Sequence, residues 1–133
     1  MLYRAGRTST YPEKPVEKGI RLHFLGGAGE VGNVGCVIED PTGTKLLMDY
    51  GLAPTKPPKY PSEAPLVDHA VITHSHIDHI GMAPWLVGHH GTTLHGSRLT
   101  SNLSEIMWRD TYKVSSIEAV SYTHLRAHET DYY

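Results

Sequence analysis

Short apolar runs separated by turn residues occupy the first half of the chain. Residues 20–25 alternate between apolar and polar side chains, which is the pattern of a half-buried β-strand. A second run covers residues 34–39, and the Asp-Pro-Thr-Gly sequence at 40–43 has the composition of a turn before a third run at 45–49. Short strands that follow one another so closely predict a meandering sheet.

The second half of the chain combines a buried strand with helical spacing. Residues 54–65 hold five of the nine prolines, a density that excludes a helix and predicts an extended loop. Residues 66–73 form a largely buried strand. We expect a helix at 80–89, a short strand at 92–95 and an amphipathic helix at 97–112. Strands and helices mixed in this way indicate the α/β class.

Length and composition limit the kind of protein. The chain has 133 residues, of which 39% are hydrophobic and 20% charged, so it is globular and holds one domain at most. The apolar runs are far shorter than the roughly 18 residues that cross a membrane. The formal net charge of -2 gives no sign of the basic surface that proteins use to bind nucleic acid. With no visible secretory signal and Cys36 as its single cysteine, the chain is expected in the reducing cytoplasm.

The two ends of the chain are interpreted separately from the middle. Residues 1–19 are polar and aperiodic, which predicts a flexible lead-in. Residues 120–133 begin with eleven residues that resemble the translation of a transposase adaptor used in sequencing libraries. We interpret this segment as an assembly artefact, so His124 and His128 are excluded as ligands. The remaining residues 20–119 are then part of a domain whose natural chain continues further.

Histidine is the residue type in clear excess, with ten in the chain. Three of them and a carboxylate lie within six positions, as His74, His76, Asp78 and His79, where a buried strand ends and a helix begins. A tight turn there can direct the first two at one cation and the last two at a second. Imidazole and carboxylate donors suit zinc, manganese or iron. A helix cap at Asp78 alone leaves the three histidines unexplained.

The pattern H-x-H-x-D-H after a hydrophobic strand resembles the signature of the metallo-β-lactamase superfamily. The resemblance implies the N-terminal half of an αββα sandwich, truncated, with apolar surface uncovered where the second half belongs. It implies that His74 and His76 bind one Zn²⁺ and that Asp78 and His79 bind another, with Mn²⁺ or Fe²⁺ as possible replacements. A hydroxide between the metals would be the nucleophile, oriented by Asp78. Asp49 would hydrogen-bond and orient the ligands, and we expect the four to converge beside it.

Two further segments resemble one branch of that superfamily. Residues 25–32 (LGGAGEVG) are similar to the opening of the β-CASP RNA nucleases, and residues 101–114 are similar to the helix after their metal motif. This resemblance implies a ribonuclease in RNA processing, with RNA as its partner. The glycines at 27–32 also match the G-x-G-x-x-G motif, but a strand follows them where a dinucleotide site needs a helix.

Two alternative functions remain open. One is a generic hydrolase of thioesters or lactones, similar to glyoxalase II. The other is a non-catalytic member that binds RNA or a partner protein, which the intact motif disfavours. The superfamily's downstream ligands have no match in residues 80–119, where His89, His90 and His95 come too early and are read as surface histidines. The chain as given is therefore expected to have low activity.

Overall fold

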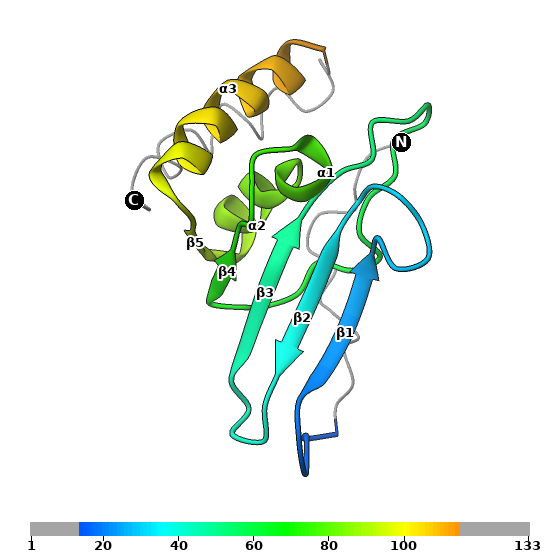
Figure 1. Cartoon of the computed structure of the whole chain (residues 1–133), viewed down its shortest axis with the longest axis vertical. Helices are drawn as coiled ribbons and strands as arrows, with labels where there is room; N and C mark the ends of the chain where they lie inside the picture. The colour runs from blue at the N-terminus through cyan, green and yellow to red at the C-terminus, as the bar shows by residue number, and fades with distance from the viewer. Residues whose placement is uncertain (1–13, 115–133) are drawn as a thin grey trace.

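The computed structural model describes residues 14–114, and in this part of the chain five strands form one mixed sheet with helices packed around one end of it (Figure 1). The strands lie in their sequence order. The predicted α/β class is confirmed. In chain order the elements are β1 (Arg21–Gly26), β2 (Gly35–Glu39), β3 (Lys45–Tyr50), β4 (His69–Val71), α1 (Ile77–Ile80), α2 (Ala83–His90), β5 (Thr93–His95) and α3 (Arg98–Val114).

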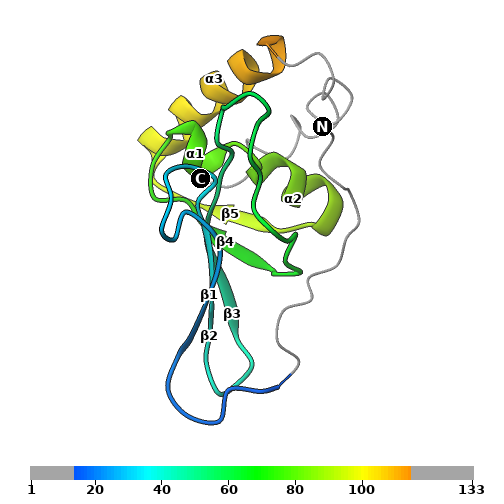
Figure 2. The same ribbon diagram turned by 90° about the vertical axis from the view of Figure 1, so that its right-hand side faces the viewer.

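The first three strands form the predicted meander, which projects beyond the helices (Figure 2). They pair antiparallel, whereas β3, β4 and β5 pair in parallel. The turn between β2 and β3 is built on Asp40, whose Oδ1 accepts hydrogen bonds from the Thr42 hydroxyl at 2.6 Å and from the Thr44 N–H at 3.1 Å. The Thr42 hydroxyl lowers the pKa of this carboxyl below its ordinary value. The loop between β1 and β2 contains no helix, so the glycines at 27–32 do not form a strand–helix dinucleotide motif.

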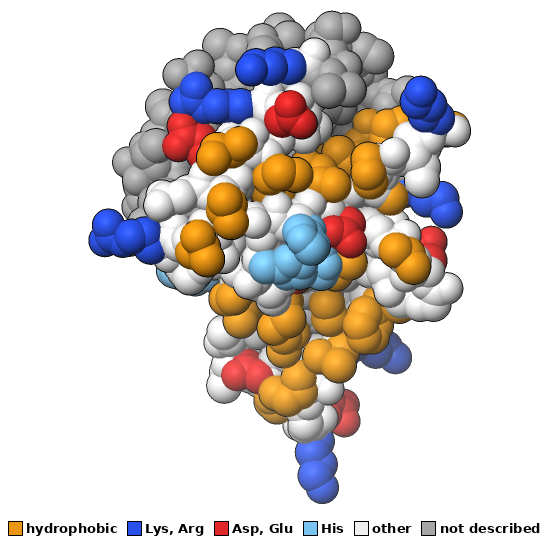
Figure 3. All heavy atoms as spheres, turned by 45° about the horizontal axis from the view of Figure 1, so that its top comes forward, with side chains coloured by type: hydrophobic (Ala, Val, Ile, Leu, Met, Phe, Trp, Pro, Cys, Tyr) orange, Lys and Arg blue, Asp and Glu red, His pale blue; other side chains and the backbone are white. Residues whose placement is uncertain are grey.

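Alternate residues of the meander face opposite sides. On one side Leu25, Val37 and Leu47 are buried in a core shared with α2. The other side is open: Leu22 and Phe24 are 54% and 56% exposed. Figure 3 shows hydrophobic side chains gathering over these strands. The register aligns the open residues in two rows, Leu22, Ile38 and Leu46 in one and Phe24, Cys36 and Met48 in the other. Partial burial in the second row raises the pKa of the Cys36 thiol. The predicted uncovered apolar surface is therefore present, and we call these six residues the open face.

Two predicted elements differ from the structure. Of the strand expected at 66–73, His69–Val71 forms strand β4. The helix expected at 80–89 begins three residues later, as α2, and the separate four-residue helix α1 ends at Ile80. Between the two helices the Met82 N–H donates to the Tyr50 carbonyl at 3.0 Å. Pro84, in the first turn of α2, has no N–H to give and suits a helix start.

A tryptophan attaches helix α3 to the end of α1. Trp108 is 2% exposed, and its Nε1 donates to the Ile80 carbonyl at the end of α1, 2.8 Å away. The predicted helix is confirmed. Trp108 is buried and Met107 packs against the core, but Leu99 and Ile106 are 68% and 62% exposed. The other buried residues of the helix carry hydroxyl groups: Thr100, Ser101 and Ser104.

The interpretations of the chain ends concern mostly residues outside the described part. Of the predicted lead-in, residues 14–19 are described, and Val16 among them is buried. The segment 120–133, interpreted as an artefact, lies wholly outside. Within residues 14–114 no helix combines the length and apolar character needed to cross a membrane.

Candidate metal centre

The predicted motif follows β4 directly. After Val71 the backbone of Ile72 still pairs with β5, through its N–H and the His95 carbonyl at 2.8 Å. Residues 73–76 then leave the sheet as an irregular segment, and α1 begins at Ile77. The motif therefore lies where a strand ends and a helix begins, as predicted, with Asp78 and His79 already in the first turn of α1. Figure 3 shows histidine side chains clustered at the surface beside an acidic one.

The three imidazoles of the motif lie against one another. The ring centroid of His74 is 4.7 Å from that of His76 and 4.0 Å from that of His79. Asp78 joins this group, because its Oδ2 lies 3.7 Å from Nε2 of His79. The structure thus brings together all four residues that the sequence singled out as metal ligands.

Asp49, near the end of β3, contacts the motif through its carboxylate. It is 3% exposed, and its carboxylate accepts three hydrogen bonds from the motif. Oδ1 accepts the Thr73 backbone N–H at 2.8 Å, and Oδ2 accepts the Thr73 hydroxyl and Nδ1 of His79, both at 2.8 Å. Asp49 holds a φ of 59°, in the left-handed region that Asp tolerates better than most residues. Asp49, which the family resemblance predicts as a site residue, is therefore in direct contact with the motif.

Thr73 determines which nitrogen of His74 is available. Its hydroxyl hydrogen is donated to Asp49, so the hydroxyl oxygen has lone pairs left for Nδ1 of His74, 2.9 Å away. Nδ1 of His74 must then carry the proton and donate it. In the same way Nδ1 of His79 donates to Asp49. Both rings consequently leave Nε2 with a free lone pair, and this is the usual arrangement of histidines that bind metals. Thr73 is a functional residue that the histidine pattern of the sequence does not reveal.

Gly51, directly after β3, allows the backbone of the motif to approach the end of that strand closely. A Cβ placed on Gly51 would overlap the carbonyl group of Asp78 and come within 2.6 Å of the His79 nitrogen. The close approach is held by two backbone hydrogen bonds of 2.9 Å, from the Val34 N–H to the Asp78 carbonyl and from the Gly51 N–H to the Val34 carbonyl. Only glycine permits this contact between β3 and the motif.

The imidazoles and the carboxylate of the motif are chemically suitable ligands for a divalent cation. Imidazole nitrogens with supported tautomers beside a carboxylate are the ligands that zinc, manganese and iron accept. Within residues 14–114, however, no three His, Cys, Asp or Glu side chains surround one point closely enough to hold a metal ion. The four side chains gather beside Asp49, but their donor atoms do not reach the common point that we expected.

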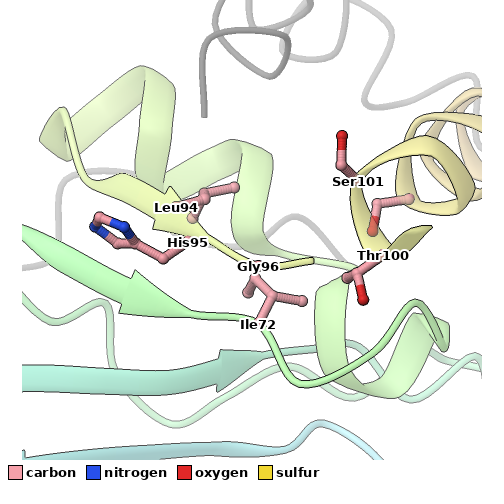
Figure 4. Close-up of a pocket in the computed structure, with 7 residues that line it drawn as sticks. Ile72, Leu94, His95, Gly96, Thr100 and Ser101 are labelled. Atoms are coloured by element: carbon pink, nitrogen blue, oxygen red, sulfur yellow. The ribbon is translucent and has the colours of Figure 1, made fainter. Parts of the chain in front are cut away.

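The other histidines of the described chain have separate contacts. His89 stacks on Trp85 with ring centroids 4.2 Å apart, and Nδ1 of His90 lies 3.0 Å from the Pro65 carbonyl oxygen. His95 lies beside His69 instead. Near His95 a cavity of about 10 Å³ separates β5 from α3, with room for about one water molecule (Figure 4). No motif residue lines this cavity, and it is too small for a substrate.

The sequence of the chain is similar to those of several known proteins. The sequence profile of the Metallo-beta-lactamase superfamily matches residues 29–124. An RNase J-like protein of Methanocaldococcus jannaschii is 30% identical over 98 residues, which cover 72% of this chain and 22% of that protein. RNase aCSPSF2 of Saccharolobus solfataricus is 33% identical over 99 residues, 71% of this chain and 20% of the relative. The transcription termination factor FttA of Methanocaldococcus jannaschii is 33% identical over 115 residues, 78% of this chain and 18% of the relative.

These relatives are much longer than the chain. It spans about a fifth of the length of the curated relatives that it matches. Two of the three are named as RNases.

Proposed function

The chain belongs to the metallo-beta-lactamase superfamily, and on that premise we propose that it is the N-terminal part of an RNA phosphodiesterase of the β-CASP branch. Relatives named RNase J-like protein and RNase aCSPSF2 support RNA as the substrate class. The opening at residues 25–32, which resembles that branch, supports the same assignment.

One observation carries the proposal: His74 and His79 each have Nδ1 engaged and Nε2 free, in rings 4.0 Å apart. We assign His74 and His76 to one cation and Asp78 and His79 to a second, with Asp49 orienting His79. Zinc is the metal that we expect, and manganese or iron are the other candidates.

The residues of the chain have distinct tasks in this proposal. Bound cations would supply a hydroxide at neutral pH and stabilise the charge that develops at phosphorus. The Asp78 carboxylate, 30% exposed, is positioned to accept a hydrogen bond from the attacking water and orient it. Asp49 is buried and keeps His79 in the tautomer with a free Nε2. The substrate that binds to this site is RNA.

We also propose a boundary for the domain. Residues 20–119 belong to the superfamily domain, and residues 120–133 are an assembly artefact, although the profile match runs to residue 124. Resequencing the gene across this boundary tests the proposal directly. An uninterrupted reading frame that continues after residue 119 with a different sequence supports it, and recovery of the same residues 120–133 contradicts it.

The decisive experiment uses the longer polypeptide encoded by the uninterrupted gene, purified with zinc. We expect it to hydrolyse a labelled RNA oligonucleotide, and we expect Asp78→Asn to reduce the rate by at least about a hundredfold. The substitution keeps the size of the side chain but removes the charge that a cation needs. A matched control is Asp110→Asn, an exposed carboxylate on α3, which should leave the rate unchanged.

Other outcomes identify the alternatives. Hydrolysis of a thioester or a lactone without hydrolysis of RNA would favour the generic hydrolase. RNA binding without hydrolysis, unaffected by a chelator, would favour the non-catalytic member. RNA hydrolysis that Asp78→Asn leaves intact would contradict the assigned site.

A further inference from the structure

A second pair of histidines lies outside the motif, on neighbouring strands. His69 begins β4 and His95 ends β5, and both side chains are exposed. Nδ1 of His69 lies 2.9 Å from Nε2 of His95, with ring centroids 5.1 Å apart and ring planes at 48°. In Figure 4 the His95 side chain leaves β5 on the side of β4, away from Thr100 and Ser101.

The sheet itself places these two rings together. The parallel register pairs His69 with Thr93 and Val71 with His95, so the two histidines lie diagonally across two strands on one face. Backbone hydrogen bonds of 2.8 Å on both sides, from Thr93 to Asp68 and from Ile72 to His95, hold this register. The pair is therefore preorganised by strand pairing and does not depend on a mobile loop.

The separation of the two nitrogens matches the bite of a metal ion. With metal–nitrogen bonds of about 2.0–2.1 Å, two ligands at right angles have their nitrogens about 2.9 Å apart. The same separation serves a hydrogen bond between neutral imidazoles. When a cation binds, this bond breaks and the donor ring exchanges its proton through solvent to its other nitrogen, so both rings stay neutral and both facing nitrogens have a lone pair. Small rotations of the two exposed rings then direct both lone pairs at one point.

We propose that His69 and His95 form an exchangeable site for a divalent transition metal, separate from the motif and independent of the function proposed above. Two imidazoles with open positions beside them suit Cu²⁺, Ni²⁺ or Zn²⁺, and Cu²⁺ binds tightest of the three to such nitrogens. No third His, Cys, Asp or Glu side chain completes a metal site in the described part of the chain. Water therefore supplies the remaining ligands, and the metal exchanges readily.

The experiment titrates the full chain with Ni²⁺ alone and follows binding by calorimetry. His124 and His128, which lie outside the described residues, are replaced by alanine in every protein so that they contribute nothing. We expect His69→Ala and His95→Ala each to weaken one Ni²⁺ site by at least tenfold. The double variant should lose less binding free energy than the sum of the two single losses, because either single substitution already removes the chelate.

The matched control is His89→Ala, which removes an exposed histidine whose ring stacks on Trp85. It should leave Ni²⁺ binding unchanged. A second readout is the electron paramagnetic resonance spectrum of bound Cu²⁺, in which either His69→Ala or His95→Ala removes one of the two nitrogen ligands of this site and leaves any signal from Cu²⁺ at the motif unchanged. Equal Ni²⁺ affinity in parent, His69→Ala and His95→Ala, or losses that add in the double variant, would overturn the proposal. Circular dichroism and urea unfolding verify that each variant is folded.

Discussion

Oδ2 of Asp49 lies 2.8 Å from Nδ1 of His79, although the two residues are thirty positions apart in the sequence. Asp49 lies near the end of β3 in the meander, and His79 is the last residue of the motif, in helix α1. The contact joins the two halves of the described chain at the candidate metal centre. The carboxylate of Asp49 is buried, and three hydrogen-bond donors stabilise its negative charge there.

Replacing Asp49 should weaken metal binding before it unfolds the protein. Asp49→Asn keeps the shape of the side chain and tolerates a positive φ, but its amide nitrogen cannot accept a hydrogen bond. We expect zinc affinity to fall roughly 10–100-fold and the free energy of unfolding to fall by about 1–3 kcal/mol. Calorimetric titration with zinc and urea denaturation measure the two effects.

Asp49→Ala serves as the comparison, because alanine loses the hydrogen bonds and is also strained at a φ of 59°. It should lower the free energy of unfolding by roughly a further 1–2 kcal/mol relative to Asp49→Asn. An Asn variant with the zinc affinity of the parent protein would show that the Asp49–His79 contact does not support the ligands.

Thr73 is expected to act through its hydroxyl alone. Thr73→Val keeps the branched shape but leaves Nδ1 of His74 without its acceptor, whereas Thr73→Ser retains it. We expect the Val variant to bind zinc about tenfold more weakly and the Ser variant to bind nearly as the parent does. Nitrogen NMR of the His74 ring provides an independent readout, because the proton should reside on Nδ1 in the parent and Ser proteins and redistribute in the Val protein. Identical ring spectra in all three would refute the role of the hydroxyl.

Local pattern was sufficient to locate the motif, since its four residues lie within six positions at the end of an apolar strand. The role of Asp49 came from a family resemblance, because nothing local distinguishes it from a turn residue. Long-range contacts could not be predicted from the sequence: the Met82 N–H bonds to the Tyr50 carbonyl of β3, and α2 starts only after it. His69 and His95 likewise became a pair only through the register of β4 and β5.

Gly51 should be intolerant of even the smallest side chain. In Gly51→Ala the new methyl group overlaps the Asp78 carbonyl, so the motif has to move away from β3. We expect a loss of about 1–3 kcal/mol in the free energy of unfolding, together with zinc binding too weak to measure by calorimetry. Gly96→Ala is the control, because its nearest neighbour is an ordinary 3.5 Å contact with the Ile72 carbonyl oxygen. If both variants bind zinc equally well, the Gly51 contact does not position the motif.

Adjacent residues of β1 allow a test of whether the open face is solvated in solution. Phe24 is 56% exposed and Leu25 is 2% exposed, so truncation should affect them very differently. We expect Leu25→Ala to lower the free energy of unfolding by about 2–5 kcal/mol and Phe24→Ala by less than about 1 kcal/mol. Urea denaturation of this chain at several protein concentrations measures both. A large cost for Phe24→Ala that grows with protein concentration would mean that copies of the chain bury the open face against one another, because only an association equilibrium depends on concentration in this way.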